Sequence, residues 1–167
     1  LFEKAVLWLH DAIEHGKTVL ENVAMYELHM DIEAALLHTG EAITIGTQIL
    51  EMLGIPLVAE PPGELNLDEL FHLPAMTDPA ALAALPILSK CVPAAYQLDT
   101  NLLNSVVYTM VKTSRTCGND PHSAFAYVMY GLLLSSSPET LELGYRFGEL
   151  GVNLLQQFNS KALECRV

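Results

Sequence analysis

Apolar residues recur every three or four positions along most of this chain, and that period restricts the fold more than any other feature of the sequence. The period places side chains on one side of an α-helix, whereas a half-buried β-strand needs alternation with period two. No stretch alternates for long enough to form a convincing strand, and the β-branched residues fall on the helical stripes. The pattern therefore predicts an all-α fold with at least six helices.

The first third of the chain predicts three helices separated by short turns. Residues 2–15 carry one apolar stripe, residues 18–39 carry two, and residues 42–53 carry one that a Gly-Ile-Pro sequence ends. Gly40 is expected to break the pattern between the second and third helices. A helix with two apolar stripes has neighbours on two sides. Short turns also make sequential helices antiparallel neighbours, as in bundles and helical-hairpin repeats.

Prolines mark a connector in the middle of the chain. Residues 54–77 contain four of them, which is too many for a regular element, although Asn66–Phe71 could form one or two helical turns. We therefore expect one helical-repeat domain over 1–167, with a first helical group (1–53), this irregular connector and a second group (78–167). A start at Leu1, rather than at Met, suggests a fragment of a longer chain.

The second group predicts four more helical segments from their start signals. These starts are Asp78-Pro79, Asp99-Thr100, Ser123 and Ser137-Pro138-Glu139. Pro86 and Pro93 lie inside the first of the four segments and are expected to kink or split it. The segment from Ser123 to Leu134 is almost wholly apolar, and its aromatic residues fit core packing better than a ligand box.

Glycines on the last helix predict a close helix contact. The expected buried stripe consists of Leu143, Gly144, Phe147, Gly148, Gly151, Leu154, Leu155 and Phe158. Gly148 should lie against the backbone of the 123–134 helix, so that Gly148→Leu would overpack the interface. Gly46 and Gly148 stand in similar sequences 102 positions apart, which is three periods of about 34 residues, the tetratricopeptide length. The expected architecture is antiparallel hairpins stacked as a tetratricopeptide-like superhelix or a right-angled bundle.

The charge argues against some partners. The net charge is −12, whereas binding of nucleic acid or an anionic membrane rests on clustered Lys and Arg. The excess is uneven, because residues 1–72 hold thirteen acids and two lysines. The longest apolar run, Ala124–Leu134, is too short to cross a bilayer, and no signal peptide leads the chain. We expect a cytoplasmic protein without membrane insertion, and the sequence leaves its oligomeric state open.

Three cysteines, Cys91, Cys117 and Cys165, are too widely spaced for a CxxC motif and odd in number. Free thiols, mostly buried, are the expected state. The phosphate-loop, GxGxxG, HExxH, GxSxG and kinase catalytic-loop motifs are absent from the sequence. We therefore assign no catalytic, cofactor-binding or metal-ligating residue, and no cofactor.

Histidines in the first helices are the one feature that leaves metal chemistry open. His10 and Glu14 share a helix face, in a sequence one residue longer than the inverted zinc-protease motif HxxEH. Further potential ligands are His29, Asp31, Glu33, His38 and Glu41. They are expected to scatter over several faces as solvated surface. Metal analysis of the protein with and without His10→Ala would test this minor alternative.

Two stretches of the last third carry a family resemblance. The sequence from Asp120 to Gly131 and the sequence from Gly144 to Leu150 resemble the helical region that follows the ATPase module in large signalling proteins of bacteria and fungi. Further similarities lie in Gly40–Ile43, Leu53–Ile55 and Leu73–Pro79, so that the resemblance spans roughly residues 18–167. Those proteins join a serine/threonine kinase-like domain, a predicted ATPase, this tetratricopeptide-like region, a GAF sensor and often a histidine kinase.

The resemblance implies a role rather than a chemistry. The shared motifs form turns and packing contacts, and the nucleotide, phosphate-transfer and sensor sites of such proteins would lie outside this segment. The expected function is a non-catalytic scaffold that relays between the kinase, ATPase and sensor domains of one chain. A stand-alone protein that binds peptides with its helical repeats is the alternative. The flanking reading frame separates the two.

Overall fold

The structure is a computed structural model that describes residues 2–160 and residue 163. The helices are α1 (Phe2–His15), α2 (Val19–Ala35), α3 (Thr39–Met52), α4 (Leu67–Phe71), α5 (Pro79–Leu98), α6 (Thr100–Cys117), α7 (Pro121–Leu134) and α8 (Leu141–Phe158). Within the described residues the only β-type pairing is an isolated bridge between Ala75 and Asn119. The all-α prediction is confirmed.

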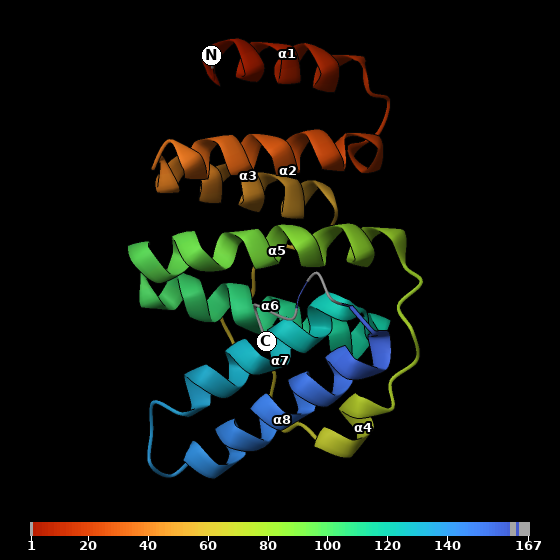
Figure 1. The fold of residues 1–167 in the computed structure, drawn as a ribbon, viewed down its shortest axis with the longest axis vertical. Coiled ribbons are helices and arrows are strands. Elements are labelled where there is room, and N and C mark those ends of the chain that lie inside the picture. Colours follow the sequence, from red (N-terminus) through yellow and green to blue (C-terminus); the bar gives the residue numbers. More distant parts are fainter. Residues whose placement is uncertain (1, 161–162, 164–167) are drawn as a thin grey trace.

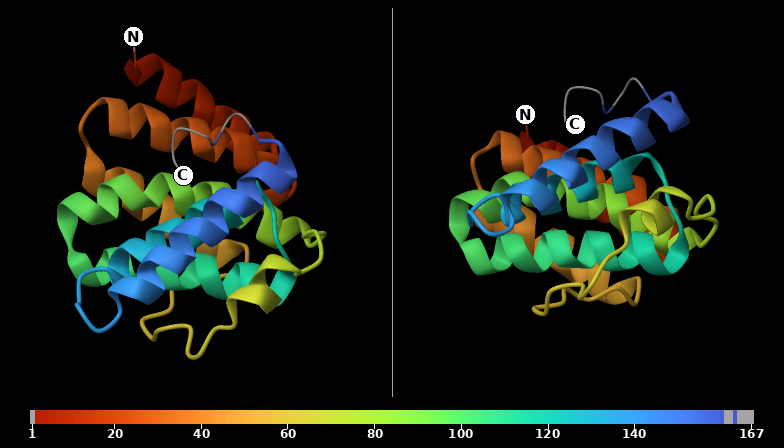
Figure 2. Two further views of the ribbon diagram at one scale, coloured as in Figure 1. Left: turned by 60° about the horizontal axis from the view of Figure 1, so that its bottom comes forward. Right: turned by 90° about the horizontal axis from the view of Figure 1, so that it is seen from below.

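The helices form a stack of hairpins that follows the order of the chain (Figure 1). Helix α1 packs on α2, which pairs with α3; α5 then packs on both α2 and α3 and pairs with α6. Helix α7 packs on both α5 and α6 and pairs with α8. Figure 2 shows α8 crossing the molecule beside α7, and the short α4 packs against α8. Thus α1 lies at one end of the stack and the α7–α8 hairpin at the other.

One hydrophobic cluster runs through both helical groups. Its largest fully buried side chains are Met30, Ile49, Leu50, Leu85, Ile87, Leu88, Val106, Val107, Met110, Tyr127, Phe147 and Leu154. Helix α5 lies at the centre and has the length and composition of a membrane span, but 56% of its most apolar window is buried inside the fold. Core helices pass the same test of length and composition, so this is weak evidence for a span.

Pro86 and Pro93 were expected to kink or split helix α5, and the structure shows that they do not split it. It begins as predicted, with Pro79 in the first turn and the Asp78 carboxylate accepting a hydrogen bond from the Ala80 N–H at 3.3 Å. It then continues without a break through Pro86 and Pro93. A proline inside a helix costs about 3 kcal/mol, but α5 packs on α2, α3, α6 and α7. Burial on so many sides outweighs that cost.

The turn between α2 and α3 lies earlier than predicted. Helix α2 ends at Ala35, and Leu37 adopts a left-handed backbone with φ 63°. The His38 N–H then donates to the Glu33 carbonyl at 2.9 Å, as in the Schellman ending that glycine usually makes. Gly40, expected to break the helix, lies inside α3. A leucine supplied the left-handed residue, which residue preferences would not select.

The starts of α7 and α8 also differ from the predictions. Helix α7 begins at Pro121 rather than Ser123, because Asp120 is its N-cap and Ser123 completes a capping box with it. Helix α8 begins at Leu141, after a turn that contains the expected Ser-Pro-Glu start. The Thr140 hydroxyl donates to the Leu134 carbonyl and closes that turn. Because of these local hydrogen bonds, both helices begin a few residues away from the predicted starts.

The glycine prediction at the α7–α8 interface names the wrong residue. A Cβ added at Gly148 would meet nothing within 4 Å, whereas one at Gly131 would lie 2.5 Å from the Gly144 carbonyl oxygen. Gly151 is also tight, at 2.7 Å from the Ala124 carbonyl oxygen. Gly148→Leu would thus not overpack the interface. Its match to Gly46 fails as well, because a Cβ at Gly46 would lie 2.5 Å from the Cys91 sulfur.

Candidate binding groove

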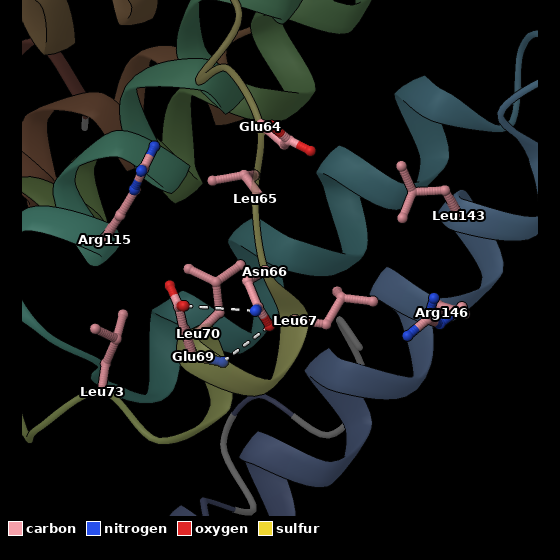
Figure 3. A pocket seen from close by; sticks show the side chains of 10 residues that line it. All are labelled: Glu64, Leu65, Asn66, Leu67, Glu69, Leu70, Leu73, Arg115, Leu143 and Arg146. Carbon is pink, nitrogen blue, oxygen red and sulfur yellow. Dashed lines mark hydrogen bonds between the residues drawn. The ribbon is translucent and has the colours of Figure 1, made fainter.

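A pocket of about 660 Å³ lies between the connector, the end of α6 and the start of α8 (Figure 3). Its lining residues are Glu64, Leu65, Asn66, Leu67, Glu69, Leu70, Leu73, Arg115, Leu143 and Arg146. Leu143 was expected in the buried stripe of the last helix, but it is 38% exposed beside this pocket. The pocket thus brings together segments that are far apart in the sequence.

Asn66 shapes the connector side of the pocket. Its side-chain oxygen accepts hydrogen bonds from the Asp68 and Glu69 N–H groups, at 3.0 and 3.3 Å, and so caps α4. The predicted helical turns over 66–71 are confirmed as this short helix. The cap starts a helix whose Leu70 is buried in the core, while Leu67, Asn66 and Glu69 remain along the pocket (Figure 3).

A second pocket of about 740 Å³ shares Arg115 with the first. Its walls are Val58–Gly63 of the connector together with Lys112, Arg115 and Thr116 of α6. Arg115 lines both pockets, and its guanidinium donates a hydrogen bond to the Pro62 carbonyl at 3.1 Å. We call the two pockets together the connector groove. It runs along the connector where that segment crosses the end of α6.

Three cations lie along the connector groove in a strongly acidic protein. Among the described residues, Lys112, Arg115 and Arg146 have no carboxylate within ion-pair distance, whereas Lys90 pairs with Asp31 at 2.6 Å. Glutamates also line the groove, at positions 60, 64 and 69. With apolar leucines between charges of both signs, the groove suits a polypeptide segment that carries apolar and charged side chains.

A buried hydrogen-bond network fixes the connector in place. The Asn119 side chain donates to the Leu70 carbonyl at 2.6 Å and accepts from the Tyr127 hydroxyl at 2.9 Å. Its backbone N–H donates to the Pro74 carbonyl, and its carbonyl accepts from the Met76 N–H, both at 2.8 Å. One side chain from the α6–α7 turn thus ties the connector to the core.

The turn before Asn119 depends on a glycine. Gly118 ends α6 with φ 100°, a conformation that side chains disfavour. A Cβ there would collide with the Pro74 carbonyl. The sequence predicted the end of the helix at this point, but it showed no sign that the connector backbone passes so close.

The structure brings several of the predicted histidine and acidic residues together. Glu33 lies between two histidines, with its carboxylate 3.4 Å from His29 Nε2 and 2.8 Å from His38 Nδ1. The His10 ring contacts the His29 ring edge-on at a centroid distance of 5.2 Å. The expected scatter over separate faces is therefore wrong for these residues. The cluster connects α1, α2 and the turn that leads into α3.

The part of the chain that the structure describes contains no site arranged to bind a metal ion. No group of three or more His, Cys, Asp or Glu side chains is placed there to hold a metal ion. Glu14 and His15, the other members of the HxxxEH sequence, are exposed on α1, and His15 bonds to the Asp11 carbonyl at 2.6 Å. Histidine–carboxylate contacts and the ring contact between His10 and His29 account for the arrangement of the cluster.

The thiols have the environment of structural residues. Cys91 is fully buried in α5, and Cys117 is partly buried near Asp78. Burial raises the pKa of the Cys91 thiol from 9.0 to about 12. Burial, followed by the charge of Asp78, also raises the pKa of Cys117. A raised pKa lowers the thiolate fraction at neutral pH and therefore the reactivity. Cys165 lies outside the described residues.

Stability should fall at alkaline pH because of Cys91. Its pKa is raised in the folded state, so its contribution is complete below pH 9.0 and is lost as the pH rises toward about 12. The loss is at most about 1.4 kcal/mol per pH unit. Urea unfolding at about pH 8 and pH 10 should show a steeper decline for the wild type than for Cys91→Ala. Equal declines would contradict the burial of an un-ionised thiol.

Sequence reasoning assigned none of the residues of the connector groove to a binding site. Residues 54–77 were expected only as an irregular connector with one or two helical turns, and the cations of α6 and α8 received no assignment. Their one sequence signal was the concentration of bases in the second half, where six of the eight Lys and Arg residues lie. That signal gives no positions in space.

No protein-family model, curated protein or solved structure matches this chain.

Proposed function

We propose that this chain is a non-catalytic helical scaffold that relays between the kinase, ATPase and sensor domains of a multidomain signalling kinase. The packing of successive hairpins carries the proposal. The first helix of each later hairpin, α5 or α7, packs on both helices of the hairpin before it. Tetratricopeptide-like arrays pack in this way, and their stacked repeats present long surfaces to partners.

The connector groove gives this scaffold a surface for a neighbouring domain. It combines leucines with three cations that have no carboxylate partner among the described residues. A rim of charge around apolar contacts selects a partner by complementarity. In this proposal the catalytic steps take place in a serine/threonine or histidine kinase module elsewhere in the same cytoplasmic chain. Nucleic acid is not among its partners.

The first test is the reading frame on either side of this segment. Kinase, ATPase or GAF sequence there supports the relay, and a frame with none of them contradicts it. The second test uses the full-length protein with Arg146→Ala, and with Tyr96→Ala as an exposed control on α5 outside the groove. We expect Arg146→Ala to reduce signal-dependent autophosphorylation without changing ATP binding. Equal autophosphorylation in the wild type and both variants would contradict a role for the groove.

The alternative is a stand-alone protein that binds peptides. The observation that favours it is the groove itself, because apolar side chains lie next to cations that have no carboxylate partner within the described ranges, and such a surface suits an extended peptide with acidic residues. Peptides selected on the purified chain from a random library should then lose affinity for Arg115→Ala. Selection of peptides whose binding is indifferent to Arg115 and Arg146 would argue against this groove as their site.

A further inference from the structure

Helix α2 has a second apolar stripe that the fold leaves largely uncovered. Val23, Tyr26 and Met30 face the core from one side of the helix. On another side, Ala24, Met25, Leu28 and Ala35 are exposed around the buried Ile32. Leu28 is 48% exposed in the middle of the helix. Two stripes predicted two sets of neighbours, and the second stripe lacks a full covering.

The packing of the later hairpins shows what is missing at this stripe. Helix α5 lies on both helices of the hairpin before it, and so does α7. Helix α2 is the first helix of its own hairpin, yet α1 is the only helix before it among the described residues. If α1 is the second helix of an earlier hairpin, the first helix of that hairpin has to contact both α1 and α2.

Helix α1 is exposed in the same sense. It forms one end of the stack (Figure 1), and its Leu7 and Trp8 side chains are 66% and 74% exposed. Its inner side is held by Leu9, which is buried, and by a hydrogen bond from the Asn22 side chain to the Ile13 carbonyl at 2.9 Å. End helices of such stacks need a polar outer face to stay soluble. Asp11, Glu14 and His15 are exposed on α1 as well, so its outer face mixes polar and charged groups with two large apolar side chains that a further helix would cover.

We infer that the second stripe of α2 and the adjoining side of α1 form the docking face for one more helix, encoded immediately before α1 in the same protein. That helix is amphipathic, lies antiparallel to α1 and packs on both α1 and α2. The acidic excess of residues 1–72 favours Lys and Arg along its edges by charge complementarity. The inference rests on helix packing and does not depend on the proposed signalling role.

The test compares two proteins: residues 1–167, and the same chain extended at its N-terminus by the natural preceding segment. Leu28→Gln and Leu98→Gln form a matched pair, because both leucines are 48% exposed. In the extended protein Leu28→Gln should increase the unfolding equilibrium constant about tenfold more than Leu98→Gln, or about 1.4 kcal/mol. In 1–167 the two variants should behave alike. Glutamine keeps the helix propensity close to that of leucine.

Trp8 gives an independent readout, since it is the only tryptophan of the chain. With tryptophans in the added segment replaced by Phe, acrylamide should quench Trp8 less in the extended protein than in 1–167. Equal effects of the matched pair in the extended protein would overturn the inference. So would a natural reading frame that starts at residue 1, or a dimer of 1–167 that Leu28→Gln dissociates, because a second copy would then occupy the face.

Discussion

Replacing Gly131 with alanine is expected to destabilise the protein by about 2 kcal/mol, whereas the same change at Gly148 should stabilise it by about 0.5–1 kcal/mol. The two glycines lie in helices α7 and α8, which form one hairpin. Urea unfolding of the two variants and the wild type measures both signs. The comparison isolates packing, because the chemical change is identical.

The atoms around each glycine explain the opposite signs. A Cβ at Gly131 would lie 2.5 Å from the Gly144 carbonyl oxygen and 3.0 Å from the Phe147 Cβ. Backbone atoms of α8 cannot move aside without shifting the helix, so α7 and α8 would separate. A Cβ at Gly148 enters open space, which leaves only the benefit of removing a glycine from a helix. A higher free energy of unfolding for both variants than for the wild type would show that the α7–α8 hairpin is packed differently.

The second large effect is expected for Asn119→Leu. Leucine has a similar size but cannot bond to the Leu70 carbonyl or to the Tyr127 hydroxyl, which Asn119 contacts at 2.6 and 2.9 Å. Each buried polar group that loses its partner costs about 1–3 kcal/mol. We therefore expect a loss of about 2–5 kcal/mol in the free energy of unfolding, measured by urea denaturation. The connector should also become more accessible to proteases, because Asn119 fixes it to the core.

Tyr127→Phe provides the control for this network. It removes only the hydroxyl that donates to Asn119, so it should cost less than Asn119→Leu. The double variant should cost less than the sum of the two, since both changes break the same hydrogen bond. Additive losses would show that Asn119 and Tyr127 act independently. A connector equally resistant to proteolysis in Asn119→Leu and wild type would contradict its anchoring role.

Much of the secondary structure could be predicted from the sequence. The apolar period identified the helices, and caps such as Asp78 and Asp99 marked starts that the structure confirms. These signals are local, because an N-cap or a stripe involves residues a few positions apart. Where the structure differs from these predictions, contacts between residues far apart in the sequence determine the course of the helix. Helix α5 continues through Pro86 and Pro93 because four other helices pack on it.

The candidate site could not be predicted in the same way. Arg115 and Arg146 reach one pocket only after the connector has folded over the end of α6. Glu33 contacts His29 one turn earlier on α2, and it also meets His38 because the left-handed Leu37 turns the chain after α2, which the pattern did not indicate. The pocket and the Glu33–His38 contact both depend on the path of a loop. Loop paths follow from long-range packing and hydrogen bonds rather than from periodicity.

The glycines show most directly which features the sequence determined and which only the tertiary structure decided. The sequence by itself determined that this chain folds as helices and that small residues allow two of them to approach closely. Only the tertiary structure decided that Gly131, rather than Gly148, lies where the α7 and α8 backbones meet. A stripe records which side of a helix is apolar. The rotation of that side against its neighbour, which selects the glycine in contact, is set by the packing of all the surrounding side chains at once.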